Sequence, residues 1–87
     1  MNSTESEILQ IQPNPFSTAA TILLPSNIDI ENSELIVYDI LGKILWRVNN
    51  VDDYSIQIDR GKLSAGIYIV RLITKGITKG TVKMMIE

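Results

Sequence analysis

The chain has 87 residues, 45% of them hydrophobic, with a formal net charge of −2 and neither cysteine nor histidine. This length suits one compact domain, and the acidic balance gives no electrostatic basis for nucleic-acid binding, which depends largely on Lys and Arg neutralising phosphates. The missing His and Cys exclude Ser-His and Cys-His nucleophile systems and ordinary zinc sites.

The first residues, 1–7, are polar and acidic. They lack the positive and apolar regions of a secretory signal, and no segment of the chain reaches the roughly 18 apolar residues of a membrane span, so we expect no membrane insertion. We interpret residues 1–7 as the remnant of a linker behind an added start codon and residues 8–87 as the domain itself. The chain is therefore expected to be a fragment of a longer protein.

Apolar residues alternate with polar ones or form short runs, and turn residues interrupt them about every 8–12 positions, which is typical of an all-β sandwich or barrel. The sequence predicts seven strands, at residues 8–12, 20–24, 34–39, 43–48, 54–59, 66–75 and 78–87. A polar loop is expected at residues 26–33. We therefore predict an all-β fold, a seven-stranded antiparallel immunoglobulin-like β-sandwich.

The middle of the chain predicts a tight hairpin at Asp39–Lys43, with Gly42 at a positive φ. In the strand that follows, strict alternation places Ile44, Trp46 and Val48 on one face. Leu45 then faces outward unless a β-bulge intervenes.

A corner between the two sheets is predicted at Leu63, Gly66 and Tyr68. Leu63 is expected to close the end of the core, and Gly66 to permit the bend. Tyr68 is expected to bury its ring and to hydrogen-bond nearby backbone through its hydroxyl. These residues then stabilise the sandwich and perform no chemistry.

Three other groups of side chains are candidates for ligand sites: Asp29, Glu31 and Asn32; Asp52 and Asp53; Trp46 and Tyr54. The first group offers too few oxygens for calcium, which takes about 6–8. The carboxylate pair is more typical of a solvated turn than of a catalytic site, and the aromatic pair of half-buried strand positions than of a sugar-binding platform. The sequence predicts no catalytic residues, no metal and no cofactor.

Three motifs occur in a fixed order: PNPF early, VYDILGK in the middle, and LSAGIYIVRL followed by KGTVKMMIE at the end. Together they resemble, over residues 8–87, the type A C-terminal sorting domain of the type IX secretion system of Gram-negative bacteria. The matching residues are Pro13, Asn14, Pro15, Tyr38, Asp39, Gly42, Lys43, Leu63, Gly66 and Tyr68.

This resemblance implies a non-enzymatic secretion signal that follows a larger, N-terminally fused cargo. The cargo would be exported through the periplasm and across the outer membrane to the cell surface. The implied partners are the outer-membrane type IX machinery and a sortase-like signal peptidase, which removes the domain when the cargo is attached to anionic surface lipopolysaccharide. The alternatives are an adhesion or carbohydrate-binding module that stays on the secreted protein, and a passive spacer.

The last strand, 78–87, is expected at a sheet edge, where a partner strand can satisfy its free backbone groups. Lys79 and Lys83 are interpreted either as charges that protect this edge or, with Ile86 and Glu87, as contacts to the secretion machinery. Glu87 departs from the family, in which a terminal Lys is frequent. Weak self-association through an edge strand is left open.

Overall fold

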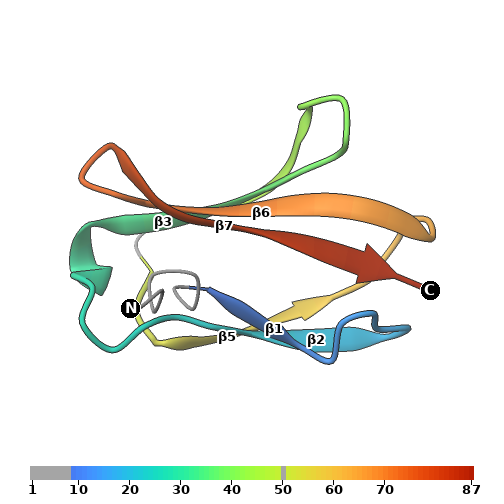
Figure 1. The fold of residues 1–87 in the computed structure, drawn as a ribbon, viewed down its shortest axis with the longest axis horizontal. Coiled ribbons are helices and arrows are strands. Elements are labelled where there is room, and N and C mark those ends of the chain that lie inside the picture. The colour runs from blue at the N-terminus through green and yellow to red at the C-terminus, as the bar shows by residue number, and fades with distance from the viewer. Residues whose placement is uncertain (1–8, 50) are drawn as a thin grey trace, which may run out of the picture.

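The computed structural model of the chain describes residues 9–49 and 51–87, and these form seven strands in two antiparallel sheets. The three-stranded sheet has the order β1-β2-β5 and contains β1 (Gln10–Gln12), β2 (Ala19–Leu23) and β5 (Ser55–Asp59). The four-stranded sheet has the order β4-β3-β6-β7 and contains β3 (Ser33–Tyr38), β4 (Ile44–Val48), β6 (Gly66–Thr74) and β7 (Ile77–Ile86). Figure 1 shows the two layers facing each other, which confirms the predicted all-β sandwich.

The strand boundaries lie within one or two residues of those predicted. Ile8 and the predicted linker, 1–7, lie outside the described residues. The predicted loop 26–33 contains one short 3₁₀ helix, Ile30–Asn32, and Ser33 already begins β3. Ser33 tolerates this buried position because its hydroxyl lies 2.7 Å from the Thr74 hydroxyl and donates to the Asp29 carbonyl at 2.8 Å. No helix among the described residues is long and apolar enough to cross a membrane.

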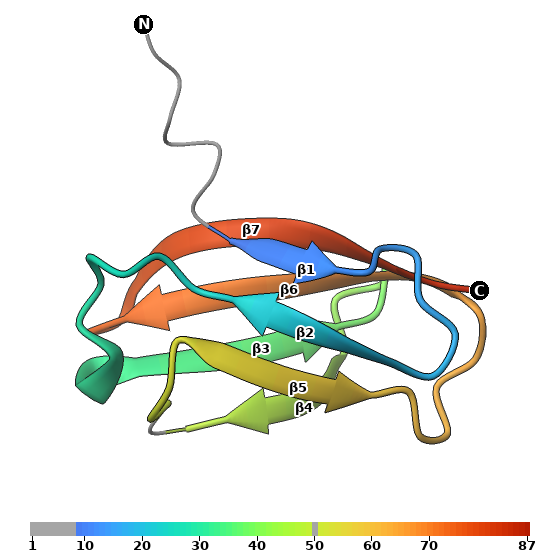
Figure 2. The ribbon, with the colours of Figure 1, turned by 90° about the horizontal axis from the view of Figure 1, so that it is seen from below.

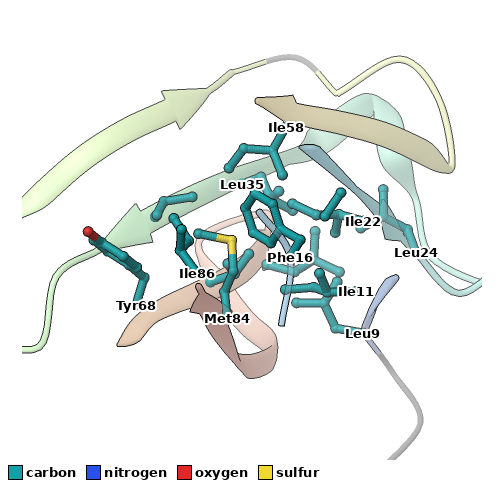
Figure 3. Packing of buried hydrophobic residues seen from close by; sticks show 14 of the residues in the cluster. Leu9, Ile11, Phe16, Ile22, Leu24, Leu35, Ile58, Tyr68, Met84 and Ile86 are labelled. Carbon is teal, nitrogen blue, oxygen red and sulfur yellow. The ribbon is translucent and has the colours of Figure 1, made fainter. Parts of the chain in front are cut away.

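The core lies between the sheets and is built from alternate residues of each strand. In β6, Tyr68, Val70 and Leu72 point inward, and in β7 Met84 and Ile86 do the same. Figure 3 shows the Phe16 ring, which comes from the β1–β2 connection, among these strand side chains. Burying each large apolar side chain contributes about 1.5–3 kcal/mol, so this cluster is the main stabilising term.

A β-bulge sets which residues of β4 face the core. The β3–β4 register shifts between Val37, which pairs with Trp46, and Tyr38, which pairs with Ile44. Leu45 and Trp46 therefore both pack against the core, whereas Ile44 is 45% exposed. The strict alternation predicted for Ile44 is wrong, and the alternative with a bulge is confirmed.

Successive strands run in opposite directions, so alternate connections gather at the same end of the sandwich. The connections at residues 13–18, 39–43 and 60–65 lie toward one end, together with Glu87, as Figures 1 and 2 show. We call this the motif end, because PNPF, the turn of VYDILGK and the first residues of LSAGIYIVRL lie there. The connections at 24–32 and 75–76 lie at the opposite end, where β1 begins.

Candidate functional site

The PNPF segment covers the outer edge of the last strand at the motif end. The Asn14 side chain accepts a hydrogen bond from the Met85 N–H at 2.9 Å and donates one to the Lys83 carbonyl at 2.8 Å. Phe16 continues the pattern with its main chain, donating to the Met85 carbonyl at 3.0 Å and accepting from the Glu87 N–H at 2.9 Å. The PNPF motif is thus a cap on β7.

This cap changes the interpretation of β7 as a free edge. β7 is the outer strand of its sheet, as expected, with β6 as its strand partner among the described elements. Its main chain at Lys83, Met85 and Glu87 is nevertheless already bonded to residues 14–16. A partner strand could add only to the part of β7 that precedes Lys83, unless it displaced PNPF.

Replacing Asn14 with Ala should lower the free energy of unfolding by about 1–2 kcal/mol, because two hydrogen bonds to main chain are lost. The Met85 amide should also exchange faster with deuterium, since its acceptor is removed. Urea unfolding and hydrogen exchange measure the two effects. Asn27→Ala, a change at an exposed loop residue, is the control and should alter neither value; equal behaviour of the two variants would contradict the cap.

Arg60 hydrogen-bonds to three segments at the motif end. Its Nε donates to the Leu63 carbonyl at 2.9 Å, and its Nη1 donates to the main-chain oxygens of Ser17 at 3.2 Å and Glu87 at 2.9 Å. One guanidinium therefore joins the β1–β2 connection, the β5–β6 connection and the end of β7, through hydrogen bonds strengthened by its charge. Sequence reasoning missed Arg60, because two of its three partners lie 27 and 43 residues away and no local pattern marks it.

The corner predicted at the start of β6 is present. Tyr68 is buried and its hydroxyl donates to the Ser64 carbonyl at 2.6 Å. Leu63 packs against the core, and Gly66 has a φ of +154°, a conformation that favours glycine. The predicted roles of all three residues are confirmed.

Removing the Tyr68 hydroxyl, as Tyr68→Phe, should lower the free energy of unfolding by about 1 kcal/mol, the net value of one well-formed hydrogen bond. Tyr54→Phe is the matched control, since the Tyr54 hydroxyl donates over 3.3 Å to the Ile28 carbonyl at an exposed site. It should cost less than about 0.5 kcal/mol. Urea unfolding compares the two, and a loss for Tyr54→Phe as large as that for Tyr68→Phe would argue against the corner.

The VYDILGK motif forms the predicted hairpin between β3 and β4. The Asp39 carboxylate accepts from the N–H groups of Leu41 and Lys43, each at 2.9 Å, and the Gly42 N–H donates to the Asp39 carbonyl at 3.0 Å. Gly42 has a φ of +90°, as predicted. This rigid turn presents two apolar side chains to solvent, with Ile40 71% and Leu41 89% exposed.

The sequence-predicted contact residues are spread along β7. Lys79 lies near the end opposite the motifs, Lys83 lies mid-strand, and both side chains are exposed. Ile86 is only 4% exposed and belongs to the core, whereas Glu87 is exposed at the motif end. Because a strand rises about 3.3 Å per residue, Lys79 and Glu87 are roughly 26 Å apart, and one partner would have to span that distance to contact both.

The remaining candidate groups make only ordinary surface contacts. Asp29 accepts from the Asn32 amide at 2.9 Å and lies 3.5 Å from the Lys75 ammonium. The hydrogen bond from Asn32 and the charge of Lys75 hold the pKa of Asp29 below its ordinary value. Asp52 and Asp53 are exposed in a loop. Across residues 9–49 and 51–87, no three acidic side chains gather as metal ligands would.

The aromatic pair does not form a platform. Trp46 is half-buried beside a hollow of about 330 Å³ that Leu45 and Leu63 also line. Tyr54 immediately precedes β5 and lies next to a different hollow, which Ile28 and Val51 also line. The two rings are thus on separate surfaces.

Comparison with known proteins identifies one family. Residues 10–87 match the family described as the secretion system C-terminal sorting domain, a match that includes all the described strands. No curated protein matches the chain.

Proposed function

The chain belongs to the type IX secretion C-terminal sorting domain family, and we propose that it is the sorting signal that directs a fused cargo protein across the outer membrane to the cell surface. The observation that carries this proposal is the family match over residues 10–87, the whole sandwich. The family is one of non-enzymatic sorting signals, and we assign no reaction to the domain.

We further propose that the motif end and β7 present the features that the secretion machinery binds. The PNPF motif holds the end of β7 in place through Asn14 and Phe16, and Arg60, which precedes the corner motif, holds it from the β5–β6 connection. The VYDILGK motif forms a hairpin at the same end, closed by the Asp39 carboxylate. Recognition would then depend on a folded surface, to which Lys79, Lys83 and Glu87 contribute side chains and Ile86 contributes packing.

Removal of the domain is the second part of the proposal. A sortase-like peptidase would cut at or before residues 1–7, ahead of β1. Support comes from the direction of β1, which begins at the end opposite the motifs in a molecule whose longest extent is 32 Å. Binding at the motif end would therefore leave the junction with the cargo accessible to the peptidase.

The test is to fuse residues 1–87 to the C-terminus of a periplasmic reporter in a Gram-negative host that has the type IX system and in an isogenic strain that lacks it. We expect surface-exposed reporter in the first strain and periplasmic reporter in the second. An antibody against the domain should not detect the surface form, whereas an antibody against the reporter should. Periplasmic reporter in both strains would refute the sorting function, and an uncut surface form would refute the removal step alone.

A further inference from the structure

The two sheets differ in the side chains of their outer faces. The strand registers place polar residues over most of the outer face of the three-stranded sheet: Gln10, Gln12, Thr21, Ser55, Gln57 and Asp59. This is the normal pattern for a sheet with one face in water. The outer face of the four-stranded sheet instead carries apolar residues among charged ones. We call the apolar residues the outer apolar face: Ile36, Tyr38, Ile44, Ile67, Ile69, Ile73 and Met85. Ile36 is covered by its neighbours and only 3% exposed. Glu34, Arg47, Arg71, Thr81 and Lys83 lie on the same side of the sheet.

The outer apolar face extends over four strands. Ile44, Tyr38 and Ile69 lie in one cross-strand row that ends at Lys83, and Ile67 pairs with the apolar Met85 of β7. Ile44, Ile67 and Met85 are 45%, 43% and 39% exposed, respectively. A contiguous exposed apolar surface of this kind is typical of an interaction site, whereas scattered single residues are not.

Arg71 lies within this face, and one N–H group of its guanidinium donates no hydrogen bond to any residue that the structure describes. Its guanidinium carbon is 5.0 Å from the centre of the Tyr38 ring, a cation–π distance. Its Nε is shielded from solvent and has no hydrogen-bond partner among the described residues. A shielded donor without an acceptor is unfavourable. The carboxylate of a docked partner would supply an acceptor once the Arg71 side chain turns outward from the sheet.

The charge of the face also favours an acidic partner. Arg47 and Glu34 form an ion pair, with Nε and Oε1 3.9 Å apart, so their charges offset each other. The remaining charges on the face, those of Arg71 and Lys83, are both positive. This positive excess sits on a chain whose net charge is −2. Figure 1 shows the β3–β4 hairpin rising from the four-stranded sheet on its outer side, and this hairpin carries the exposed Ile40 and Leu41.

We propose that the outer apolar face docks onto an apolar protein surface that carries a carboxylate for Arg71, and that this surface belongs to the secretion machinery. The inference rests on the proposed sorting function and deepens it. A second copy fits less well, because two such faces meeting about a twofold axis would oppose their Arg71 and Lys83 side chains. An anionic membrane also fits less well, since two excess cations attract it only weakly.

The test uses reporter fusions of residues 1–87 in the host with the type IX system. One variant carries Ile44→Thr, Ile67→Thr and Met85→Thr, which remove apolar surface but keep β-forming side chains. Its control carries Gln12→Thr, Ser55→Thr and Gln57→Thr on the other sheet. Arg71→Met tests the charge, and its control is Lys75→Met, a change at an exposed residue at the end opposite the motifs. Thermal unfolding of the purified domains shows whether each variant is folded. If the triple variant does not fold, the single change Ile67→Asp, with Gln57→Asp as its control, tests the docking face instead.

We expect the triple Thr variant, Arg71→Met and Ile67→Asp each to lower the surface fraction of the reporter by about tenfold or more, as for central interface residues. The control variants should stay within about twofold of the parent, the unchanged fusion. If the parent is delivered and folded face variants are delivered equally well, the docking face is refuted while the sorting function stands. If the parent itself stays in the periplasm, the sorting function fails first.

Two further measurements on the purified domain test whether a second copy of the domain or an anionic membrane binds the outer apolar face instead. Sedimentation should show a monomer, and mixing with vesicles of anionic lipid should leave the domain in solution. A dimer that the triple face variant abolishes would assign the face to a second copy. Vesicle binding that the same variant abolishes would assign it to the membrane, and either result would overturn the proposal.

Discussion

Replacing Phe16 with Ala should lower the free energy of unfolding by about 3–5 kcal/mol, the typical cost of removing a buried aromatic ring. Phe16 is 2% exposed, and its ring lies inside the core although it comes from a connection. A domain of this size has roughly 4–13 kcal/mol in total, so the loss is a large fraction of its stability. The midpoint of thermal unfolding should fall by at least about 12 °C.

Circular dichroism at increasing temperature measures this effect, and Leu41→Ala is the matched control. Leu41 is 89% exposed, so the same kind of truncation should change the free energy of unfolding by less than about 0.5 kcal/mol. A loss of under about 1 kcal/mol for Phe16→Ala would mean that PNPF does not anchor the end of β7 through the core.

Deleting residues 78–87 from a reporter fusion should leave the reporter in the periplasm. The deletion removes most of β7, which pairs with nearly the whole of β6 and supplies Met84 and Ile86 to the core. It also removes the partners of Asn14 and Arg60. Both the fold and the proposed contact surface are lost, and surface delivery of the truncated fusion would refute the role of this strand.

A companion experiment separates recognition from folding. Lys79→Glu and Lys83→Glu reverse charges on exposed side chains, so each should leave the thermal midpoint nearly unchanged. If these lysines contact the machinery, each should lower surface delivery, whereas the charge reversal Asp53→Lys in the exposed loop before β5 should not. Equal delivery of all three variants would instead support the alternative that the lysines only protect the sheet edge.

The features predicted best from the sequence depend on neighbours along the chain. Strand positions followed from alternation, the hairpin from Gly42, and the corner from Tyr68, whose hydrogen-bond partner lies only four residues away. Each of these involves a local conformational preference that residue type reports directly.

The features that could not be predicted depend on contacts between distant segments. Asn14 caps a strand 71 residues later, and Arg60 joins three segments, so neither role has a local pattern. The bulge in β3–β4 was foreseen only as an alternative, because the choice of which side chains fill the core depends on the opposite sheet. The apolar outer face became visible only when the register showed which residues share a surface.

We propose that the secretion machinery recognises this domain specifically and that the domain is not a passive spacer. To test this, two reporters are placed in one cell that has the type IX system, one fused to residues 1–87 and one fused to an unrelated seven-stranded sandwich of similar size. The surface fraction of each reporter is then measured. Most of the first reporter should reach the surface while the second stays in the periplasm, and equal surface fractions would refute specific recognition.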